Sequence, residues 1–426
     1  PNGTQITNGW GDAYTGSDSS VTPDQIFIHD ATPRYAVVQL DTEHGTEAAV
    51  LSHDNFKNWN DVCAQSIAES GAVQRPFKLY SDWTAGTNSN YITAFGTASY
   101  YYYQGALYVY SSANIQLDLN GYKIDRALST ERSHGLVIRV SGKLEIIDSY
   151  AGDDREGMIT GGKTTNVTYA GGVAVYNGGE CVILGGTITG NTGPNGGVSA
   201  YSAGKLSLGG DVKIYGNTNS AGEDKNITIS STTGVIGIAA ELTGGKKFGV
   251  TRLGNGAFTE GFGEHHTEDK SPQDFFISED GLYRIVLSEL DGKREGAMLS
   301  NDNAVNWLYT VQQSLGSNGA EKEYTLYSPW TAAENSSYRT AFGTNGTAYY
   351  SGGLYVPAGA NIVLDLNGHT INRNYDGGIV IYVAGTLKII DRTVNSDTDV
   401  KGTITGGNYG VYIYNGGSCT LEEGVI

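Results

Sequence analysis

GGVAVYNGGECVILGG (171–186) and GGVSAYSAGKLSLGG (196–210) are the stretches that decide the fold. They are two copies of one pattern, in which the equivalent residues Cys181 and Leu206 lie 25 positions apart. Apolar residues alternate with other residues between pairs of glycines, as in short strands that turn one face toward a core. A 25-residue period of strands and turns without helices predicts a parallel β-solenoid, in which each coil pairs with its neighbours.

The composition agrees with many short strands joined by tight turns. The chain of 426 residues contains 61 Gly but only 8 Pro, and 39% of its residues are hydrophobic. Glycine adopts positive φ angles at corners without strain, whereas scarce proline leaves strand ladders uninterrupted. Because there is no Gly-X-Y period, a collagen is excluded. A coiled coil is excluded because Ala, Glu, Lys and Leu do not dominate.

The charge excludes one class of partner. The chain carries 27 basic and 45 acidic residues, a net charge of −18. Such a surface repels phosphate backbones, so we expect no nucleic acid as a partner.

No apolar run approaches the roughly 20 residues that a membrane-spanning helix needs. The three cysteines match neither a disulfide framework nor a zinc pattern. Cys181 and Cys419 alternate with apolar residues and are expected to act as buried hydrophobes.

A much longer repeat contains the short one. LYSDWTA (79–85) recurs as LYSPWTA (326–332), and LDLNG (117–121) recurs at 364–368. We therefore divide the chain into residues 1–52, the C-terminal tail of a preceding module; 53–300, one complete module; and 301–426, the N-terminal part of a second module. The chain is expected to be an excerpt from a longer tandem array. Residues 53–300 are called the first copy below, and residues 301–426 the second copy.

Each module is expected to begin with a helix. Residues 53–70 and 301–316 space their apolar side chains at helical intervals, and Gly71 and Gly316 follow as stop signals. Such a helix would cap the open end of a solenoid, whose strand edges are unpaired. Before the second helix, residues 283–299 predict a hairpin with an Asp-Gly turn.

Four phrases resemble right-handed parallel β-helix segments of the pectin-lyase-like fold. They are VPAGANIVLDLNGHTI (356–371), GTLKIID (385–391), GTITGG (402–407) and GGTITGN (185–191). They are similar in particular to repeats of the large surface and adhesin proteins of Gram-positive bacteria. The resemblance covers residues 106–217 and 353–426, and implies an all-β chain of tandem right-handed β-helix modules on a bacterial cell surface. It does not fix an activity, because adhesins, lyases, hydrolases and phage tailspikes share this fold.

An enzyme on this fold would need clustered carboxylates for Ca²⁺ with a base, or a pair of acidic residues. The candidates are Asp148 and Asp391, with Arg126 and Arg373 as base or substrate clamp. Aspartates at strand ends more often accept backbone N–H bonds in corners, and strand-end arginines are more often solvated. We expect no cofactor; Ca²⁺ is the one candidate ion, but no motif in the sequence supports it. The pair His265-His266 has no counterpart in the other copy, so a metal site is not expected.

Asparagines and glycines of the repeated LDLNG phrase are expected in turns. These are Asn120, Gly121, Asn367 and Gly368. Gly and Asn favour the positive φ angles of tight turns. In a solenoid, such asparagine side chains can also stack and bond to one another along successive coils.

Clustered tyrosines are the remaining sequence feature that indicates a binding surface. SYYYYQG (99–105) becomes AYYSGG (348–353) in the second copy. In a strand, alternate rings point outward, and exposed rings can stack on sugars or on a neighbouring subunit. The predicted contact residues are Tyr101, Tyr103, Tyr349 and Tyr350, and the predicted partners are glycans or further copies of the chain.

The repeat favours a non-catalytic extracellular structural or adhesive protein, in which tandem β-helix modules form a stalk or fibre. The alternatives are a carbohydrate-active enzyme, a lyase or glycosidase, and a glycan-binding module that uses the tyrosine face.

Overall fold

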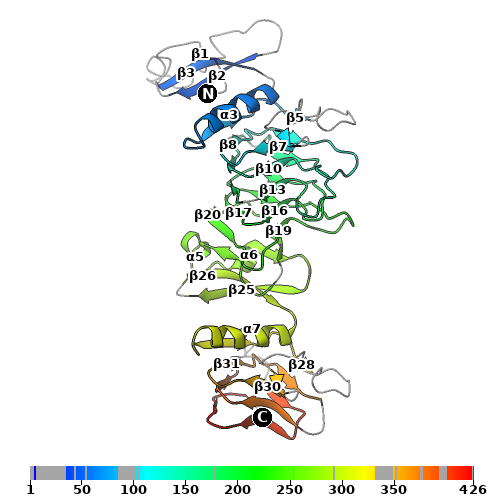
Figure 1. The fold of residues 1–426 in the computed structure, drawn as a ribbon, viewed down its shortest axis with the longest axis vertical. Coiled ribbons are helices and arrows are strands. Elements are labelled where there is room, and N and C mark those ends of the chain that lie inside the picture. Colours follow the sequence, from blue (N-terminus) through cyan, green and yellow to red (C-terminus); the bar gives the residue numbers. More distant parts are fainter. Residues whose placement is uncertain are drawn as a thin grey trace. The chain divides into compact units, whose positions relative to one another are not determined.

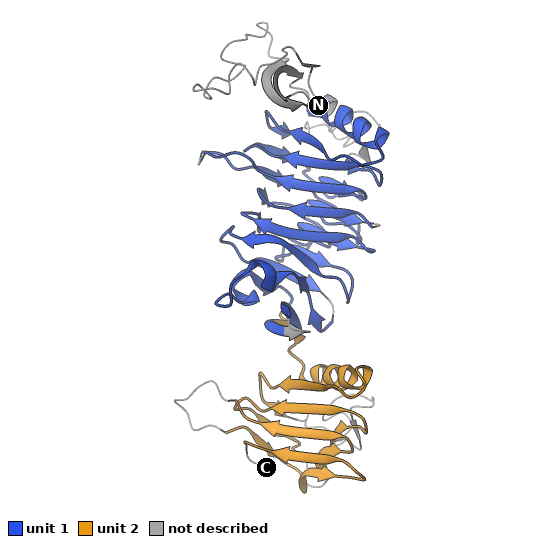
Figure 2. Cartoon of the chain, turned by 90° about the vertical axis from the view of Figure 1, so that its left-hand side faces the viewer, with its two compact units in different colours: residues 1–280, 285–298 blue, residues 281–284, 299–426 orange. Residues whose placement is uncertain are grey.

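The computed structural model describes most of the chain, and β-strand is the predominant regular secondary structure of the described residues. They are residues 4–5, 35–42, 45–52, 55–84, 102–103, 106–152, 154–176, 178–252, 254–290, 293–331, 349–350, 353–374, 378–392, 401–424 and 426. The chain forms two compact units, which Figure 2 shows in different colours. Unit 1 comprises residues 1–280 and 285–298, and unit 2 comprises residues 281–284 and 299–426.

Three mainly parallel sheets make up most of unit 1 among the described residues. The first contains, in spatial order, β24 (Phe276–Ser278), β21 (Phe248–Arg252), β19 (Ile227–Ile229), β16 (Val198–Tyr201), β13 (Val173–Tyr176), β10 (Ile138–Val140), β7 (Ala106–Val109) and the antiparallel β6 (Tyr102–Tyr103). The second contains β23 (Thr259–Glu260), β20 (Ile236–Leu242), β17 (Lys205–Gly210), β14 (Glu180–Ile183), β11 (Lys143–Ile147), β8 (Asn114–Asp118) and β4 (Arg75–Lys78). The third contains β18 (Lys213–Ile214), β15 (Thr187–Ile188), β12 (Met158–Thr160), β9 (Lys123–Asp125) and β5 (Trp83–Thr84).

The chain visits the three sheets in rotation, and Figure 1 shows β7, β10, β13 and β16 of the first sheet in successive positions. Strands β7, β8 and β9 belong to the first, second and third sheets, and β10 returns to the first. We call such a set of three consecutive strands a layer. The 25-residue period predicted from the sequence is confirmed, because Cys181 lies opposite Leu206 and Ile183 opposite Leu208 in the parallel pair β14–β17. Equivalent residues therefore stack on equivalent residues from one layer to the next.

The predicted helix at the start of each copy is confirmed. The two helices are α3 (Asn55–Ala68) in unit 1 and α7 (Asn303–Gly316) in unit 2. Each helix buries one tryptophan completely, Trp59 or Trp307. The Trp59 ring packs edge-on against Phe77 at 5.3 Å and tilts against Trp83 at 6.4 Å. Such aromatic packing fixes the helix against the first layer.

One serine of each helix also completes the hydrogen bonding of a strand. The Ser66 hydroxyl donates to the Asn114 carbonyl and accepts from its N–H. Ser314 makes the same pair of bonds with Asn361 in unit 2. A buried backbone group without a partner costs about as much as a lost hydrogen bond. The helices therefore dock through polar bonds as well as through apolar packing.

Smaller elements flank the three sheets. An antiparallel sheet consists of β1 (Thr4–Gln5), β3 (Gly45–Ser52) and β2 (Tyr35–Thr42). The short helices α5 (Phe262–His265) and α6 (Pro272–Phe275) follow β23. The predicted hairpin is confirmed as β25 (Tyr283–Leu290) and β26 (Lys293–Ser300), which pairs with β22 (Gly256–Ala257). Its predicted turn residues Asp291 and Gly292 lie outside the described residues.

Unit 2 repeats the strand order of unit 1. The described sheets contain β27 (Glu321–Thr325), β31 (Asn361–Asp365), β34 (Thr386–Ile390) and β37 (Ser418–Leu421); β28 (Trp330–Thr331), β32 (Thr370–Asn372) and β35 (Thr403–Thr405); and β29 (Tyr349–Tyr350), β30 (Gly353–Val356), β33 (Ile379–Val383) and β36 (Tyr409–Ile413). Only β29 runs antiparallel to its neighbour among these pairs. The assignment of residues 1–52 to a preceding module stays a prediction.

A ladder of buried asparagines joins successive layers of unit 1. Asn191 donates from both its backbone N–H and its Nδ2 to the Asn217 side-chain oxygen, at 3.1 and 3.0 Å. Asn217 donates in the same way to Asn226, at 3.2 and 3.1 Å. Asn226 then donates from its backbone N–H and Nδ2 to Glu279, both at 2.8 Å. Burial raises the pKa of Glu279 although these bonds oppose that effect.

The ladder predicts a large and local loss of stability when its middle member is removed. In the Asn217→Ala variant, Asn191 loses its acceptor, and the carbonyls of Ile188 and Tyr215 lose a donor. Unsatisfied buried groups of this kind cost about 1–3 kcal/mol each, so we expect unit 1 to lose about 2–3 kcal/mol. Chemical denaturation measures the change. The exposed Ser220→Ala control should stay within about 0.5 kcal/mol of the wild type, and an equally small change for Asn217→Ala would contradict the role of the ladder.

Candidate functional site

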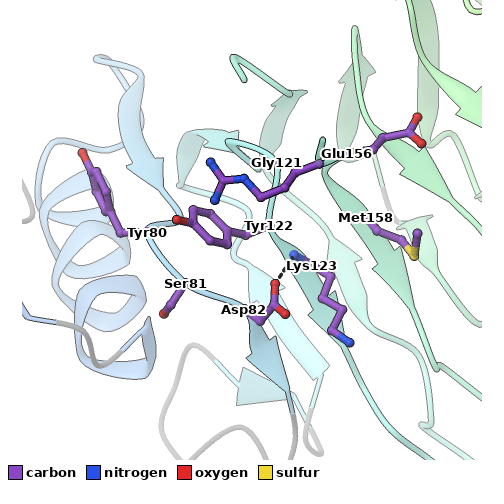
Figure 3. Close-up of a pocket in the computed structure, with 9 residues that line it drawn as sticks. Tyr80, Ser81, Asp82, Gly121, Tyr122, Lys123, Glu156 and Met158 are labelled. Atoms are coloured by element: carbon purple, nitrogen blue, oxygen red, sulfur yellow. Dashed lines mark hydrogen bonds between the residues drawn. The ribbon is translucent and has the colours of Figure 1, made fainter. Parts of the chain in front are cut away.

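A surface pocket of unit 1 is the strongest candidate for a binding site (Figure 3). Its volume is about 460 Å³, which lies within the usual range for small-molecule sites. Its lining comes from the corner between the second and third sheets in three successive layers. The lining residues are Tyr80, Ser81 and Asp82 between β4 and β5; Gly121 and Tyr122 before β9, with Lys123 as the first residue of β9; and Arg155 and Glu156 before β12, with Met158 as the first residue of β12.

An arginine held between two aromatic rings is the main charged group of the pocket. The Arg155 guanidinium lies 4.4 Å from the centre of the Tyr122 ring and 4.0 Å from that of Tyr150. The two tyrosines raise the pKa of Arg155, so it remains charged. The Tyr150 hydroxyl donates to Asp154 and lowers the pKa of that carboxyl. Tyr150 therefore ties the arginine and the neighbouring carboxylate to one ring.

The acidic groups of the pocket already have partners. Glu156 pairs with Lys213 at 2.6 Å and accepts from the Thr187 hydroxyl at 2.5 Å. Burial acts to raise the pKa of Glu156, but these two hydrogen bonds outweigh it and lower the pKa. The Asp82 carboxylate accepts the Lys123 backbone N–H at 3.1 Å, the bond drawn in Figure 3. These bonds fix the rim of the pocket.

The Tyr80 hydroxyl is a hydrogen-bond donor over the whole ordinary pH range. Burial and the negative charge of Asp118 raise the pKa of Tyr80 to about 12. Figure 3 shows the Tyr122 side chain pointing toward the Tyr80 side of the pocket, with Ser81 between these two residues and Asp82 next to Lys123. The site thus offers ring faces, hydroxyl groups and a carboxylate within one opening.

The aspartates predicted as weak catalytic candidates hold corners together. Asp148 accepts the Gly121 N–H with Oδ1 and the Gly157 N–H with Oδ2, both at 2.6 Å. In unit 2, Asp391 accepts the Gly368 and Gly402 N–H groups at the same distances. Both oxygens of each carboxylate are therefore engaged by the backbone. Proton transfer to a substrate by either aspartate would break these bonds.

The expectation that Arg126 and Arg373 are solvated strand-end residues was wrong. They are 1% and 2% exposed and rank among the largest fully buried side chains of the described chain. Arg126 follows Ile124 by two positions, so strand alternation directs both side chains to the same, buried side. In unit 2, a Cβ atom at Gly378 would lie 2.8 Å from Arg373 Nη2. Neither arginine is on the surface as a substrate clamp would require.

The repeated turn residues occupy left-handed backbone conformations. The φ angles are 48° and 73° for Asn120 and Gly121, and 44° and 74° for Asn367 and Gly368. Asn120 Nδ2 donates to the Leu79 carbonyl at 2.9 Å, the backbone of the preceding layer. Asn367 makes the equivalent bond to Leu326 at 3.0 Å.

The stacking asparagines are therefore at other positions than the LDLNG corners. Asn191 and Asn217, which form the ladder, both stand in a Gly-Asn-Thr triplet. The recurrence of that triplet after 26 residues is the sequence pattern from which the asparagine ladder could have been predicted.

The predicted tyrosine surface is only partly within the described structure. Tyr101 lies outside the described residues. Tyr103 lies in β6, and Tyr349 and Tyr350 form β29, but their side chains are outside the description. The contact surface predicted at these four residues stays a prediction.

Other tyrosines form ladders along the first sheet. The rings of Tyr176 and Tyr201, which are 25 residues apart, stack at 5.8 Å in unit 1. In unit 2, Tyr382 packs against Tyr355 at 5.5 Å and against Tyr412 at 5.6 Å. Their strands are in parallel register. The short repeat, and not the SYYYYQG phrase, is the signal that leads to these ladders.

The cysteines are not placed as nucleophiles. Cys63 and Cys181 are buried free thiols, and burial raises the pKa of each. Cys419 is only half-buried. Within the described residues, no group of three or more His, Cys, Asp or Glu side chains could hold a metal ion.

The histidine pair contains one buried ring. His266 is 6% exposed, stacks on Phe275 at 4.4 Å and meets Phe262 edge-on at 4.6 Å. Burial lowers its pKa, and the nearby charges of His265 and Arg294 act in the same direction. Glu241 acts in the opposite direction. The neutral ring is therefore part of the apolar packing around α5 and α6.

Acid should weaken this packing. A histidine whose folded-state pKa is depressed stabilises the fold fully above its unfolded pKa of about 6.5, and this contribution is lost as the pH falls through the folded-state pKa. His266→Phe keeps the ring stacking without the titration. Thermal unfolding between about pH 7.5 and 4.5 should show the variant gaining stability relative to the wild type as the pH falls. A difference that stays constant over this range would contradict the prediction.

No helix in the described parts of the chain is long and apolar enough to cross a membrane. Comparisons of the chain with protein-family models, with curated protein sequences and with solved structures find no match.

Proposed function

We propose that the chain belongs to a non-catalytic extracellular structural or adhesive protein. In this proposal, tandem right-handed parallel β-helix modules form a stalk or fibre on a bacterial cell surface. The cellular location rests on the resemblance of phrases such as GTLKIID (385–391) to repeats of Gram-positive surface proteins. Glycans or neighbouring copies of the protein are the proposed partners.

The strand order supports the β-helix. A coil that winds past three sides contributes one strand to each of three sheets before it returns to the first. The rotation of β7, β8 and β9, followed by β10, meets this requirement, and the same rotation recurs in unit 2. The helices α3 and α7 pack where a cap on the first coil would lie, because they contact β4 and β27, each at the end of its sheet.

The observation that carries the non-catalytic assignment is the repeated use of carboxylates as corner braces. Asp148 and Asp391 each accept hydrogen bonds from backbone N–H groups with both carboxylate oxygens. Asp118 and Asp365 likewise accept the N–H of the asparagine two residues later, at 3.0 Å in both copies. A stalk needs such braces in every module, whereas an active site is needed only once.

A carbohydrate-active enzyme is the alternative from another class. It would require carboxylates that converge on an open groove. The open pocket of unit 1 contains Asp82 and Glu156, but Glu156 is held by Lys213 and Thr187. A glycan-binding module at the tyrosine phrases is the other alternative. Binding on a glycan array that is lost in Tyr101→Ala and Tyr103→Ala would favour it.

Incubation with pectin, alginate, mucin and glycosaminoglycans tests the assignment. We expect no unsaturated or reducing ends above the background of a heat-denatured sample, because neither repeated aspartate has a free oxygen for proton transfer. Product formation that disappears in a folded Asp148→Asn variant would contradict the proposal. Asp391→Asn is the matched control, since it removes the same brace from the second copy. Circular dichroism confirms that each variant remains folded.

A further inference from the structure

The pocket of unit 1 is not required by the fold. A comparison of the two copies of the module shows this. The N–H groups of Gly157 and Gly402 donate to the equivalent residues Asp148 and Asp391, so the residues next to these glycines are also equivalent. Six lining residues of the pocket change between the copies. They are Asp82 to Pro329, Tyr122 to His369, Lys123 to Thr370, Arg155 to Val400, Glu156 to Lys401 and Met158 to Thr403.

The braces beneath the pocket do not change. Asp148 and Gly121 correspond to Asp391 and Gly368, and the two bonds between them have the same length of 2.6 Å. The second copy therefore forms the same braces although Val400 stands in place of Arg155 and His369 in place of Tyr122, while Tyr80 keeps a tyrosine counterpart in Tyr327. This separates the residues that make the corner from those that give the pocket its chemistry.

Arg155 is prepared to receive an anion. Its planar guanidinium is oriented by the Tyr122 and Tyr150 rings. Asp118 and Glu156 are paired with Lys78 and Lys213. The adjacent Asp154 carboxylate accepts from the Tyr150 hydroxyl, and the charge of Arg155 also lowers its pKa. An oriented guanidinium binds a carboxylate through two parallel hydrogen bonds.

The remaining lining suits a hydroxylated ring. Tyr80 keeps its phenolic proton because its pKa is about 12, so it can donate to a ligand hydroxyl. Asp82 has acceptor capacity beyond its single bond from the Lys123 N–H, since an ionised carboxylate can accept several hydrogen bonds. Tyr80 and Tyr122 both line the pocket and supply flat ring surfaces, and Tyr122 points toward the Tyr80 side (Figure 3). Aromatic faces, hydroxyl groups and one cation together match a sugar that carries a carboxylate.

We propose that this pocket binds a sugar acid, with its carboxylate at Arg155 and its ring between Tyr80 and Tyr122. The ligand site goes beyond the structural function proposed above, and neither depends on the other. A stalk without a ligand would still have the corner braces. A bound sugar acid would not require that its glycosidic bonds be cleaved.

Glucuronate and glucose are the probes, because they differ only in the carboxylate at C6. Ligand-detected saturation-transfer NMR on the whole chain, with titration, gives both affinities. A charge-assisted bidentate contact predicts that glucuronate binds at least about tenfold more tightly than glucose. Arg155→Val, which introduces the residue of the second copy, should lower glucuronate affinity to that of glucose. Arg155→Lys should fall between the two, since it keeps the charge without the planar fork.

Lys401→Ala is the control, because Lys401 is the unit 2 counterpart of Glu156 and should leave both affinities unchanged. Equal binding of glucose and glucuronate by the wild type would overturn the proposal, as would undiminished glucuronate preference in a folded Arg155→Val variant. A disaccharide with a terminal glucuronate separates the two sources of the ligand. Binding as tight as glucuronate indicates a polymer end, and weaker binding indicates the free acid. Neither result alters the outcome of the polysaccharide cleavage assay.

Discussion

Hydrogen bonding at the corners is the constraint on which the rest of the structure depends. Parallel strands pair along their lengths, but the chain between them turns sharply and leaves N–H groups without strand partners. Asp148 meets this need twice, at Gly121 in the preceding layer and at Gly157 in its own turn. Because the bonds connect two layers, they also set the height at which β9 and β12 begin. This spacing helps to position the lining residues that adjoin the two glycines, which are Tyr122, Glu156 and Met158.

The sequence predicts those parts of the fold that depend on the local spacing of apolar residues. The 25-residue period places Cys181 opposite Leu206, and helical spacing in residues 301–316 predicts α7, because both depend on local apolar patterns. Arg126 was misjudged since composition suggests a surface residue, whereas alternation with Ile124 directs it inward. His266 gave no signal at all. Its burial depends on Phe262 and Phe275, which only the packing of α5 and α6 brings together.

The pocket was beyond prediction for a different reason. Its lining comes from 80–82, 121–123 and 155–158, segments whose separation in the chain is set by loops and not by a constant period. The 25-residue repeat begins only after them, so no pattern aligns Tyr80 with Tyr122 or Arg155. The aspartates, which were the obvious candidates, were visible because both copies contain them. That same recurrence indicates a structural role.

Two copies of one module in a single chain thus act as an internal comparison of fold and function. Positions that brace the corner keep both residue and bond length, as Asp148 and Asp391 do. Positions that face outward from that corner can change charge, as Glu156 and Lys401 do, because no backbone group depends on them. The two copies in this chain therefore keep one set of corner braces while they present different side chains at the same corner. In the proposed binding site, specificity therefore rests on an outward corner residue that only one copy has, Arg155, whereas stability rests on residues that both copies share, such as Asp148 and Asp391.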